Sequence, residues 1–311
     1  MAIIGGGGTV GSSAAFRLAG LGVASEIVLI DARENMARSH AMDLEQAAAE
    51  LGPTYVRAGT WEDLRDCGVV VLSASLPERN VASRDEYLTG NLGIVREAAG
   101  YLAAHCPRAV VIVATNPVDV FTAALARLTG MDERRFLGYS WNDTLRFRWA
   151  VARTLGEAVA DVGGLVLGEH GEMQVPLFDR ITVRSRPVEL TQEQQREVEI
   201  STRSWFSTYQ GLQSGRTSGW TSAVGIARIV EAVTTGRGDP LPGSAVLEGE
   251  YGVSGVSLGV PVRLGPGGVA EIIELELTPS QLASFQAAAD KVRSLLDSVF
   301  RGHWAEQREV R

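Results

Sequence analysis

A glycine-rich turn near the N-terminus constrains the fold of this chain more than any other segment. Three glycines, Gly6, Gly8 and Gly11, follow a short apolar run and lead into a helix-like segment. Glycine at these positions permits a tight turn, a close approach of backbone amides to a ligand, and close packing of the helix on the strand. The pattern predicts a strand, a turn and a helix whose first turn, with Thr9 and Val10, can hold a pyrophosphate.

The residue at the end of the next strand-like run refines this interpretation. Residues 27–30 are apolar and are followed directly by Asp31. A carboxylate here can hydrogen-bond a ribose diol and repels a 2′-phosphate, so Asp31 favours NAD over NADP. Arg33 lies close by and leaves NADP open. Without this context, a bare glycine motif is as often a flexible loop.

Strand-like and helix-like runs alternate through the first half of the chain. Residues 27–30, 69–73 and 110–115 are short, apolar and rich in β-branched side chains, whereas residues 36–51 and 90–104 are amphipathic. Apolar strands separated by helices are typical of a parallel sheet covered on both faces, which binds ligands at the carboxyl ends of its strands.

The second half has a different pattern. It contains three runs typical of antiparallel strands, a polar helix and a closing helix: residues 161–167, 181–183, 252–264, 191–209 and 279–300. We therefore predict an α/β fold in which a Rossmann-type doubly wound parallel sheet, residues 1–139, precedes an α+β substrate domain, residues 140–311. The boundary is expected near Tyr139.

Composition excludes several classes of function. The chain has 311 residues and 45% apolar content, enough for a large core, and a formal net charge of −8. That charge argues against a nucleic-acid or anionic membrane surface, so local arginines must hold any anionic ligand. The only lysine, Lys291, is far in sequence from every motif, which argues against a Walker-type phosphate loop and Schiff-base chemistry.

Cysteine usage and the N-terminus predict a cytoplasmic protein. Cys67 and Cys106 are too far apart for a redox pair or a thiolate metal cage, so no metal site is expected. Met1 leads straight into a strand-like run without the basic and apolar regions of a secretory signal. No apolar stretch approaches the roughly 18 residues that cross a bilayer.

Three residues suited to reducing a 2-oxo acid occur in two motifs. His170 lies between glycines after a strand-like run, Asp143 can orient an imidazole, and Arg146 falls on the same helical face as Asp143. Together they offer a proton donor, its orienting carboxylate and a bidentate clamp for a carboxylate. A structural histidine, and Asp143 as the N-cap of a helix over residues 144–152, are the competing interpretations.

These motifs, in this order, resemble the lactate/malate dehydrogenase family over nearly the whole chain. The matching pieces are the glycine turn, Asp31, and residues 83–85, 115–119, 142–148 and 168–171. The resemblance implies an NAD-dependent oxidoreductase that interconverts a 2-oxo acid and a 2-hydroxy acid. It implies that His170 protonates the substrate carbonyl, Asp143 orients His170, and Arg146 binds the substrate carboxylate.

The resemblance also implies roles for residues at other strand ends. Arg84 would polarise the substrate carbonyl from a loop that closes over the substrate, although a solvated arginine is the simpler interpretation. Asn116 would bind the nicotinamide ribose and a substrate oxygen, unless it only makes an Asn-Pro turn. Ser73 completes the predicted cofactor site. A homodimer or homotetramer is expected, with residues 36–51 as a subunit contact.

Substrate choice is where the chain departs from this family. Gapless alignment places Glu78 where lactate-type enzymes carry glutamine and malate-type enzymes carry arginine, and a carboxylate there would repel a diacid. Arg79 is adjacent and could be presented instead. Arg216 and Ser218 fall near the family's substrate pocket, and with Arg79 they could surround an oxyanion; Arg216 facing solvent is the alternative.

We therefore predict a small 2-oxo or 2-hydroxy acid with a second anionic group as the substrate. Oxaloacetate and malate are the first choice, and phosphonopyruvate is the unusual one. Lactate dehydrogenase and a non-catalytic NAD-binding protein are alternatives. A family-4 glycosidase would need a metal site of cysteine and histidine, and the sequence shows no such pair near the predicted strand ends.

Overall fold

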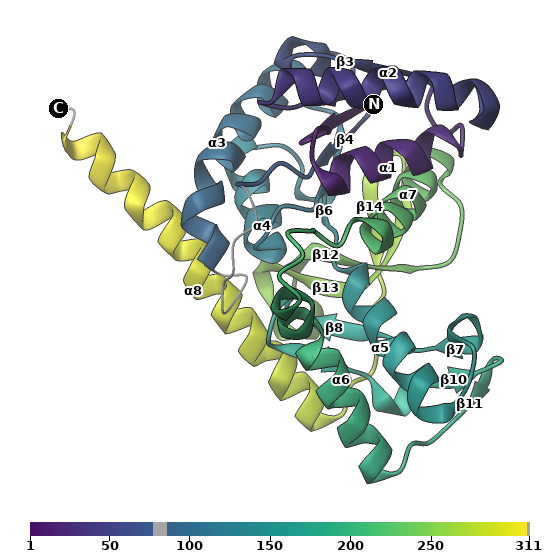
Figure 1. Cartoon of the computed structure of the whole chain (residues 1–311). Helices are drawn as coiled ribbons and strands as arrows, with labels where there is room; N and C mark the ends of the chain where they lie inside the picture. Colours follow the sequence, from purple (N-terminus) through teal and green to yellow (C-terminus); the bar gives the residue numbers. More distant parts are fainter. Residues whose placement is uncertain (77–85, 310–311) are drawn as a thin grey trace.

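The N-terminal half of the protein is a parallel sheet with helices on both faces (Figure 1). The computed structural model describes residues 1–76 and 86–309, with side chains to residue 301. The parallel strands lie in the order β3-β2-β1-β4-β5-β6. They are β1 (Ala2–Ile4), β2 (Glu26–Ile30), β3 (Tyr55–Ala58), β4 (Val69–Leu72), β5 (Val110–Val113) and β6 (Phe136–Gly138). The order reverses between β1 and β4, which is where such sheets bind ligands.

Alternating side chains explain why both faces of this sheet are covered. In β2, Ile27 and Leu29 join one hydrophobic cluster, whereas Val28 and Ile30 join another. Successive residues of a strand point to opposite faces, so an all-apolar strand needs helices on each side. The helices of this half are α1 (Thr9–Ala19), α2 (Glu34–Leu51), α3 (Tyr87–His105) and α4 (Val118–Thr129). Most buried apolar residues of α1 and α2, such as Leu18 and Leu44, belong to the first cluster, and those of α3, such as Leu102, belong to the second.

The C-terminal half extends the same sheet with antiparallel strands. β12 pairs with β6 through Ser244 and Gly138, and the order continues through β13, β8 and β9, with β14 on β13. The bounds are β8 (Val166–Gly168), β9 (Gln174–Pro176), β12 (Leu241–Glu248), β13 (Ser254–Gly265) and β14 (Gly268–Ile272). A small separate sheet contains β7 (Val162–Gly163), β10 (Thr182–Val183) and β11 (Arg186–Pro187). The pairing of β6 with β12 joins the two halves.

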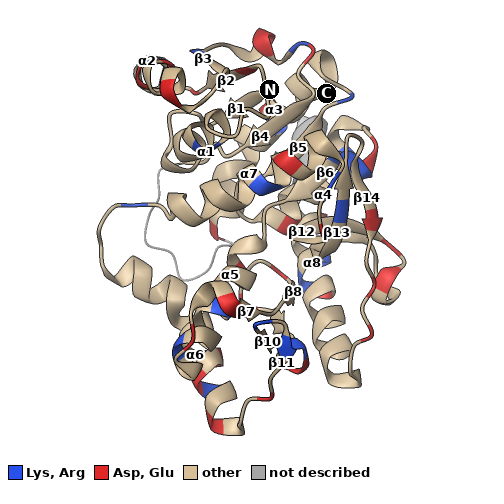
Figure 2. Cartoon of the chain, turned by 90° about the vertical axis from the view of Figure 1, so that its right-hand side faces the viewer, with Lys and Arg blue, Asp and Glu red and all other residues tan. Residues whose placement is uncertain are grey.

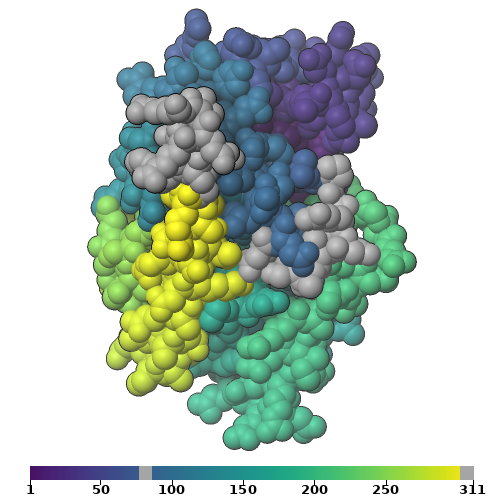
Figure 3. Space-filling view, turned by 90° about the vertical axis from the view of Figure 1, so that its left-hand side faces the viewer, coloured from purple at the N-terminus to yellow at the C-terminus, as the bar shows by residue number. Residues whose placement is uncertain are grey.

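Four long helices complete the C-terminal half as described to residue 309. They are α5 (Trp141–Leu155), α6 (Gln192–Gly211), α7 (Gly219–Thr235) and α8 (Pro279–Glu309). Short 3-10 helices cover Trp61–Leu64, Glu133–Arg135, Val159–Asp161, Phe178–Arg180 and Glu250–Gly252. Figure 3 shows α8, in yellow, running along the surface of the molecule. Buried α8 residues such as Phe285 and Leu296 anchor it in the main core.

The predicted Rossmann-type sheet and the following α/β region are confirmed, with one local correction. The run 161–167 is not a single strand, because β7 and β8 lie in different sheets. β12, which the strand patterns did not predict, carries Pro242 and Gly243, two residues that normally disfavour strands. A Cβ on Gly243 would come within 2.7 Å of the Leu137 side chain, so glycine lets β12 pass close to the β6 side chains.

The distribution of charged residues and the length of the apolar helical segments agree with what the composition indicated. Basic and acidic positions are interspersed over most elements in the view of Figure 2. None of the helices in the described part of the chain has an apolar stretch of the length that a bilayer crossing requires.

Candidate active site

A cleft of about 850 Å³, open solvent included, lies at the carboxyl ends of the parallel strands. Its walls come from both halves of the chain. The lining residues that the structure describes are Val10, Ser73, Ser75, Leu76, Tyr87, Asn91, Ala114, Thr115, Asn116, Val118, Tyr139, Asn142, Arg146, His170, Trp205, Phe206, Tyr209, Thr217, Ser218 and Ser222. The position at the switch between β1 and β4 is the one the fold favours for a ligand.

The glycine turn is shaped to let a ligand reach the start of α1. A Cβ on Gly11 would lie 2.3 Å from the carbonyl oxygen of Gly5, so only glycine fits there. Gly8 is the N-cap of α1 and supplies no side-chain cap, which leaves the first-turn amides to an anionic ligand. Thr9 is exposed and Val10 lines the cleft. The turn therefore fits a pyrophosphate.

Asp31 is held in place at the end of β2. Its Oδ2 accepts a hydrogen bond from the Gly7 amide at 2.9 Å, and its Oδ1 accepts one from the Arg33 amide at 2.9 Å. The Arg33 guanidinium donates to the carbonyl oxygen of Gly7 at 2.9 Å and pairs with Asp31. Arg33 is thus drawn onto the turn beside Asp31. These contacts fit a ribose diol at Asp31 better than a 2′-phosphate.

An imidazole and a carboxylate meet on the opposite side of the cleft. His170 follows β8 and Asp143 lies in the first turn of α5, and both are more than nine-tenths buried. His170 Nδ1 lies 2.5 Å from Asp143 Oδ2. Because an ionised carboxylate only accepts hydrogen bonds, this contact places a proton on Nδ1 and assigns proton exchange to Nε2. α5 begins at Trp141 with Ser140 as N-cap, so the N-cap interpretation of Asp143 is wrong.

Arg146 lies beside the same carboxylate. Its Nη1 is 3.4 Å from Asp143 Oδ1, as expected for two residues three apart on a helix. The guanidinium lies over the ring of Trp205 at 4.0 Å from its centroid. Among the cleft-lining residues that the structure describes, Arg146 is the one arginine or lysine. Arg148 points elsewhere and donates to the carbonyl oxygen of Gly164 at 2.9 Å.

Polar residues from three more elements complete the cleft. Asn116 follows β5, and its side-chain oxygen is buried without a hydrogen-bond partner in the structure. A buried acceptor left unpaired is costly, so this oxygen fits a ligand hydroxyl. Ser73 follows β4 and its hydroxyl donates to the carbonyl oxygen of Ile4 at 3.1 Å. Ser218 precedes α7, lines the cleft and accepts at its carbonyl from Ser222 Oγ.

The structure brings together most, but not all, of the predicted site residues. His170, Asp143, Arg146, Asn116 and Ser73 converge at the cleft. Arg216 does not line it, because its side chain is exposed and its guanidinium lies 5.8 Å from the centroid of the Trp220 ring. The predicted substrate residues of the loop, Glu78, Arg79 and Arg84, lie outside the described residues.

Sequence reasoning missed a buried network beneath His170. Asp119 accepts the His170 amide at 2.7 Å through Oδ2 and the Ser244 hydroxyl at 2.5 Å through Oδ1, and Ser244 contacts Ser257 at 2.7 Å. Burial raises the pKa of the Asp119 carboxyl to about 7. Asp119 belongs to the Asn-Pro motif, so its position in that motif was the available signal.

A charged contact behind the His170 loop was also missed. Lys291 of α8 donates to Glu169 Oε1 at 2.6 Å, and Glu169 Oε2 accepts the Met173 amide at 2.9 Å. The lone lysine is thus adjacent to the active-site loop in space although it is 122 residues away in sequence.

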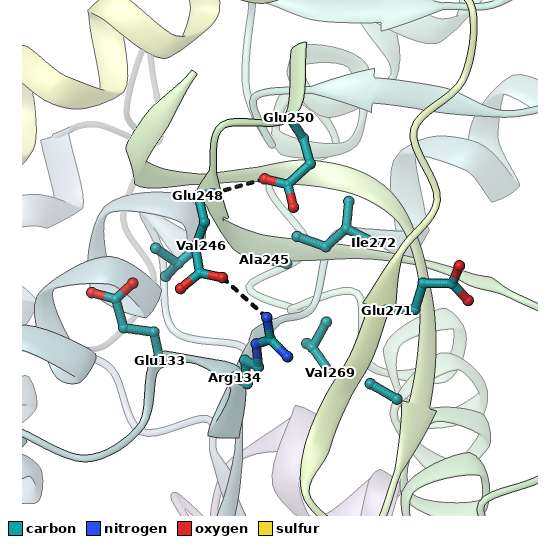
Figure 4. Close-up of a pocket in the computed structure, with 10 residues that line it drawn as sticks. Glu133, Arg134, Ala245, Val246, Glu248, Glu250, Val269, Glu271 and Ile272 are labelled. Carbon is teal, nitrogen blue, oxygen red and sulfur yellow. Dashed lines mark hydrogen bonds and ion pairs between the residues drawn. The ribbon is translucent and has the colours of Figure 1, made fainter. Parts of the chain in front are cut away.

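A second hollow is chemically unsuited to an anionic substrate (Figure 4). Four glutamates line it together with Arg134: Glu133, Glu248, Glu250 and Glu271. Arg134 already pairs with Glu248 at 3.2 Å. The excess of carboxylates would repel a 2-oxo acid, so the cleft beside His170 is the candidate active site. No group of three or more His, Cys, Asp or Glu side chains suited to a metal ion occurs among the described residues.

The fold and the cleft define the class of this protein as an NAD-dependent oxidoreductase, and comparisons give the family. Residues 1–138 match the family model for the NAD binding domain of lactate/malate dehydrogenase, and residues 142–302 match its alpha/beta C-terminal domain. A malate dehydrogenase from a Nitratiruptor species is 35% identical over 302 residues, covering 96% of this chain and 95% of that protein.

Solved structures of similar fold support the same family. The lactate dehydrogenase of Cryptosporidium parvum, complexed with lactic acid and the nicotinamide cofactor, has a TM-score of 0.90 and 28% identity, covering 96% of each chain. The malate dehydrogenase of the same organism has a TM-score of 0.92 and 25% identity, covering 96% of this chain and 98% of that one. The chain belongs to the lactate/malate dehydrogenase family. It is an NAD-dependent 2-hydroxy acid dehydrogenase, as the sequence predicted.

Proposed function

We propose that this enzyme interconverts malate and oxaloacetate, or a close analogue with a second anionic group, using NAD. The observation that carries the proposal is the convergence of His170, Asp143 and Arg146 in one cleft beside the glycine turn. The malate preference rests on relatives named malate dehydrogenase, among them one from Halobacterium salinarum that is 32% identical over 302 residues.

Each described residue then has a chemical task. Gly6, Gly8, Gly11 and Asp31 would hold NAD, which when bound would supply the hydride in its reduced form or accept it in its oxidised form. The Arg146 guanidinium binds the substrate carboxylate with two parallel hydrogen bonds, which places the carbonyl near His170. His170 Nε2 donates the proton that the carbonyl oxygen needs, and takes it back in the reverse direction. Asp143 holds the imidazole in the required tautomer and stabilises the imidazolium.

The proposal also includes three residues outside the described part of the chain, Glu78, Arg79 and Arg84. Arg84 is proposed to polarise the carbonyl, and Glu78 or Arg79 to read the distal group. Because a carboxylate facing the distal group of the substrate would repel a diacid, Arg79 is a better partner for malate than Glu78. If Glu78 faces the site instead, selectivity shifts away from oxaloacetate. Ser218 lines the same cleft and is proposed to contact the distal end of the substrate.

A substrate panel tests this assignment. NADH oxidation is measured with oxaloacetate, pyruvate and phosphonopyruvate, and each assay is repeated with NADPH. We expect the highest kcat/KM with oxaloacetate and NADH. Preference for pyruvate would identify a lactate dehydrogenase, and preference for phosphonopyruvate a reductase of an unusual acid. NADH binding without turnover of any of the three would favour a non-catalytic NAD-binding protein.

Replacement of the imidazole tests its catalytic role. His170→Asn is expected to lower kcat by about 10³-fold, the order that one general acid contributes, while the Kd for NADH stays within twofold. His105→Asn serves as the control, because His105 stacks on Tyr101 of α3 and is not among the cleft residues. Normal turnover by His170→Asn would refute the role of His170.

We also propose a domain division, an oligomeric state and a cellular location for this protein. A division into residues 1–139 and 140–311 is supported by the family models, which meet between residues 138 and 142. A homo-oligomer is supported by exposed apolar residues on α1 and α2, Phe16, Met36, Met42 and Leu51. A reducing cytoplasm suits the two free thiols, Cys67 and Cys106.

A further inference from the structure

One wall of the cleft is aromatic, and it contacts the arginine proposed to bind substrate. Trp205, Phe206 and Tyr209 of α6 all line the cleft. The Arg146 guanidinium lies 4.0 Å from the centroid of the Trp205 ring, and Trp205 stacks on Tyr209 at 5.0 Å with an angle of 14° between the rings. Trp205 therefore stacks with both the Arg146 guanidinium and the Tyr209 ring.

This stack restricts how the guanidinium can turn. A guanidinium donates all its hydrogen bonds in its own plane, so an aromatic ring against its face leaves the donating edges available. Asp143 Oδ1 lies at one edge, 3.4 Å from Nη1. The ring thus fixes the plane of the guanidinium, and the carboxylate limits its rotation within that plane. Only 11% of the Arg146 side chain is exposed, which strengthens both contacts relative to water.

We propose that Trp205 is a positioning residue for substrate binding, acting through Arg146. The inference rests on the proposed role of Arg146 as the clamp of the substrate carboxylate. A bidentate clamp works only when its two donors lie in the plane of the carboxylate, so a guanidinium free to tilt binds more weakly. Trp205 therefore sets the affinity for the 2-oxo acid, while proton donation by His170 does not depend on it.

The chain contains a matched pair for the control. Arg216 lies over Trp220 at 5.8 Å, but neither residue lines the cleft, and Trp220 is 67% exposed. Replacing Trp220 removes the same type of arginine–indole contact at a distance from the substrate site. A general effect of losing an indole would appear in both variants, whereas an effect on substrate positioning would appear only at Trp205.

The experiment compares Trp205→Leu, Trp205→Phe and Trp220→Leu with the wild-type enzyme. For Trp205→Leu we expect KM for the preferred 2-oxo acid to rise about tenfold, with kcat within threefold and an unchanged Kd for NADH. Trp205→Phe keeps a weaker aromatic face and should show an intermediate KM. Trp220→Leu should have the wild-type KM. Trp205→Phe also provides the answer if Trp205→Leu does not fold.

A double variant separates positioning through Arg146 from direct contact with substrate. Arg146→Lys replaces the planar fork by a point charge, so adding Trp205→Leu to it should raise KM by less than twofold further. A wild-type KM in both Trp205 variants, or a full additional tenfold rise in the Arg146→Lys background, would overturn the inference. Absence of 2-oxo acid turnover in the wild-type enzyme would instead refute the proposed function.

Discussion

Asp119 is a carboxyl group that folding removes completely from water. Its two oxygens accept the His170 amide and the Ser244 hydroxyl, and burial raises its pKa to about 7. An unfolded aspartate releases its proton near pH 4. Between pH 4 and 7 the folded state therefore binds more protons than the unfolded state. By linkage, this group lowers the free energy of unfolding as the pH rises through that window.

Asp119→Asn should remove this pH dependence. Asparagine is neutral throughout, and it can accept the His170 amide while donating to Ser244 Oγ. The free energy of unfolding of the variant minus that of the wild-type enzyme should therefore increase by about 2 kcal/mol from pH 5 to pH 8. Urea unfolding at both pH values measures the difference.

The control for this measurement is Asp290→Asn, whose side chain is 79% exposed and should show no such change. Equal effects of Asp119→Asn at pH 5 and pH 8 would mean that Asp119 is ionised at both.

At the scale of single residues, the sequence predicted contacts between residues that are close together in the chain. It did not predict contacts between residues that are far apart in it. Asp143 and Arg146 are three residues apart, so helical geometry alone predicted that they share a face. Trp205 was not predicted, because α6 is polar over most of its length and nothing local indicates that one of its aromatic residues contacts Arg146. Lys291 was interpreted as remote from the motifs for the same reason.

At the scale of elements, α8 supports the loop that carries His170. The ammonium of Lys291 contacts Glu169 Oε1, and the other oxygen of Glu169 accepts the Met173 amide across the loop. The Gly171 amide also donates to the carbonyl oxygen of Glu169 at 2.8 Å. The Glu169 side chain is only 5% exposed, so the lysine compensates a charge that has little access to water.

Loss of this contact should weaken both stability and activity. Lys291→Met leaves the buried carboxylate uncompensated and should lower the free energy of unfolding by roughly 2 kcal/mol, with a severalfold loss in kcat as the loop loosens. Lys291→Arg should restore most of both. Thermal unfolding and steady-state kinetics on the same samples provide the two measurements.

The double variant Glu169→Gln/Lys291→Met tests whether charge compensation is the cause. It should be more stable than Lys291→Met alone, because no buried charge remains. Arg263→Met, which breaks an exposed pair with Glu271, should cost less than about 0.5 kcal/mol. A Lys291→Met variant as stable as this control would show that α8 does not stabilise the loop through Glu169.

Element patterns predicted the parallel half of the fold better than the antiparallel half. Strands buried on both faces have continuous apolar sequences, so β2, β4 and β5 were recognisable. β12 was not, because Pro242 and Gly243 disfavour a strand on local grounds. Its strand conformation depends on pairing with β13 over most of its length and with β6 at Ser244, which are tertiary contacts.

At the scale of the whole molecule, the layer formed by α1 and α2 exposes several large apolar side chains among its polar ones. These helices pack against each other, and Met42 of α2 is 65% exposed while Phe16 of α1 is 50% exposed. α2 has 18 residues, and at about 1.5 Å per residue it is long enough to contribute to a subunit interface of ordinary size. A second copy of the chain on this layer would bury these side chains.

A charged residue at the centre of this layer should therefore dissociate the oligomer. The wild-type protein is expected to be a dimer or tetramer, and Met42→Glu should shift it towards the monomer by placing a carboxylate in an apolar contact. Ile200→Glu on α6, at a site that is 67% exposed, introduces the same charge elsewhere and should leave the assembly unchanged. Sedimentation velocity at micromolar concentration distinguishes these species. A monomeric wild-type protein would refute the predicted oligomer, whereas an intact oligomer in Met42→Glu would place the subunit contact on another face.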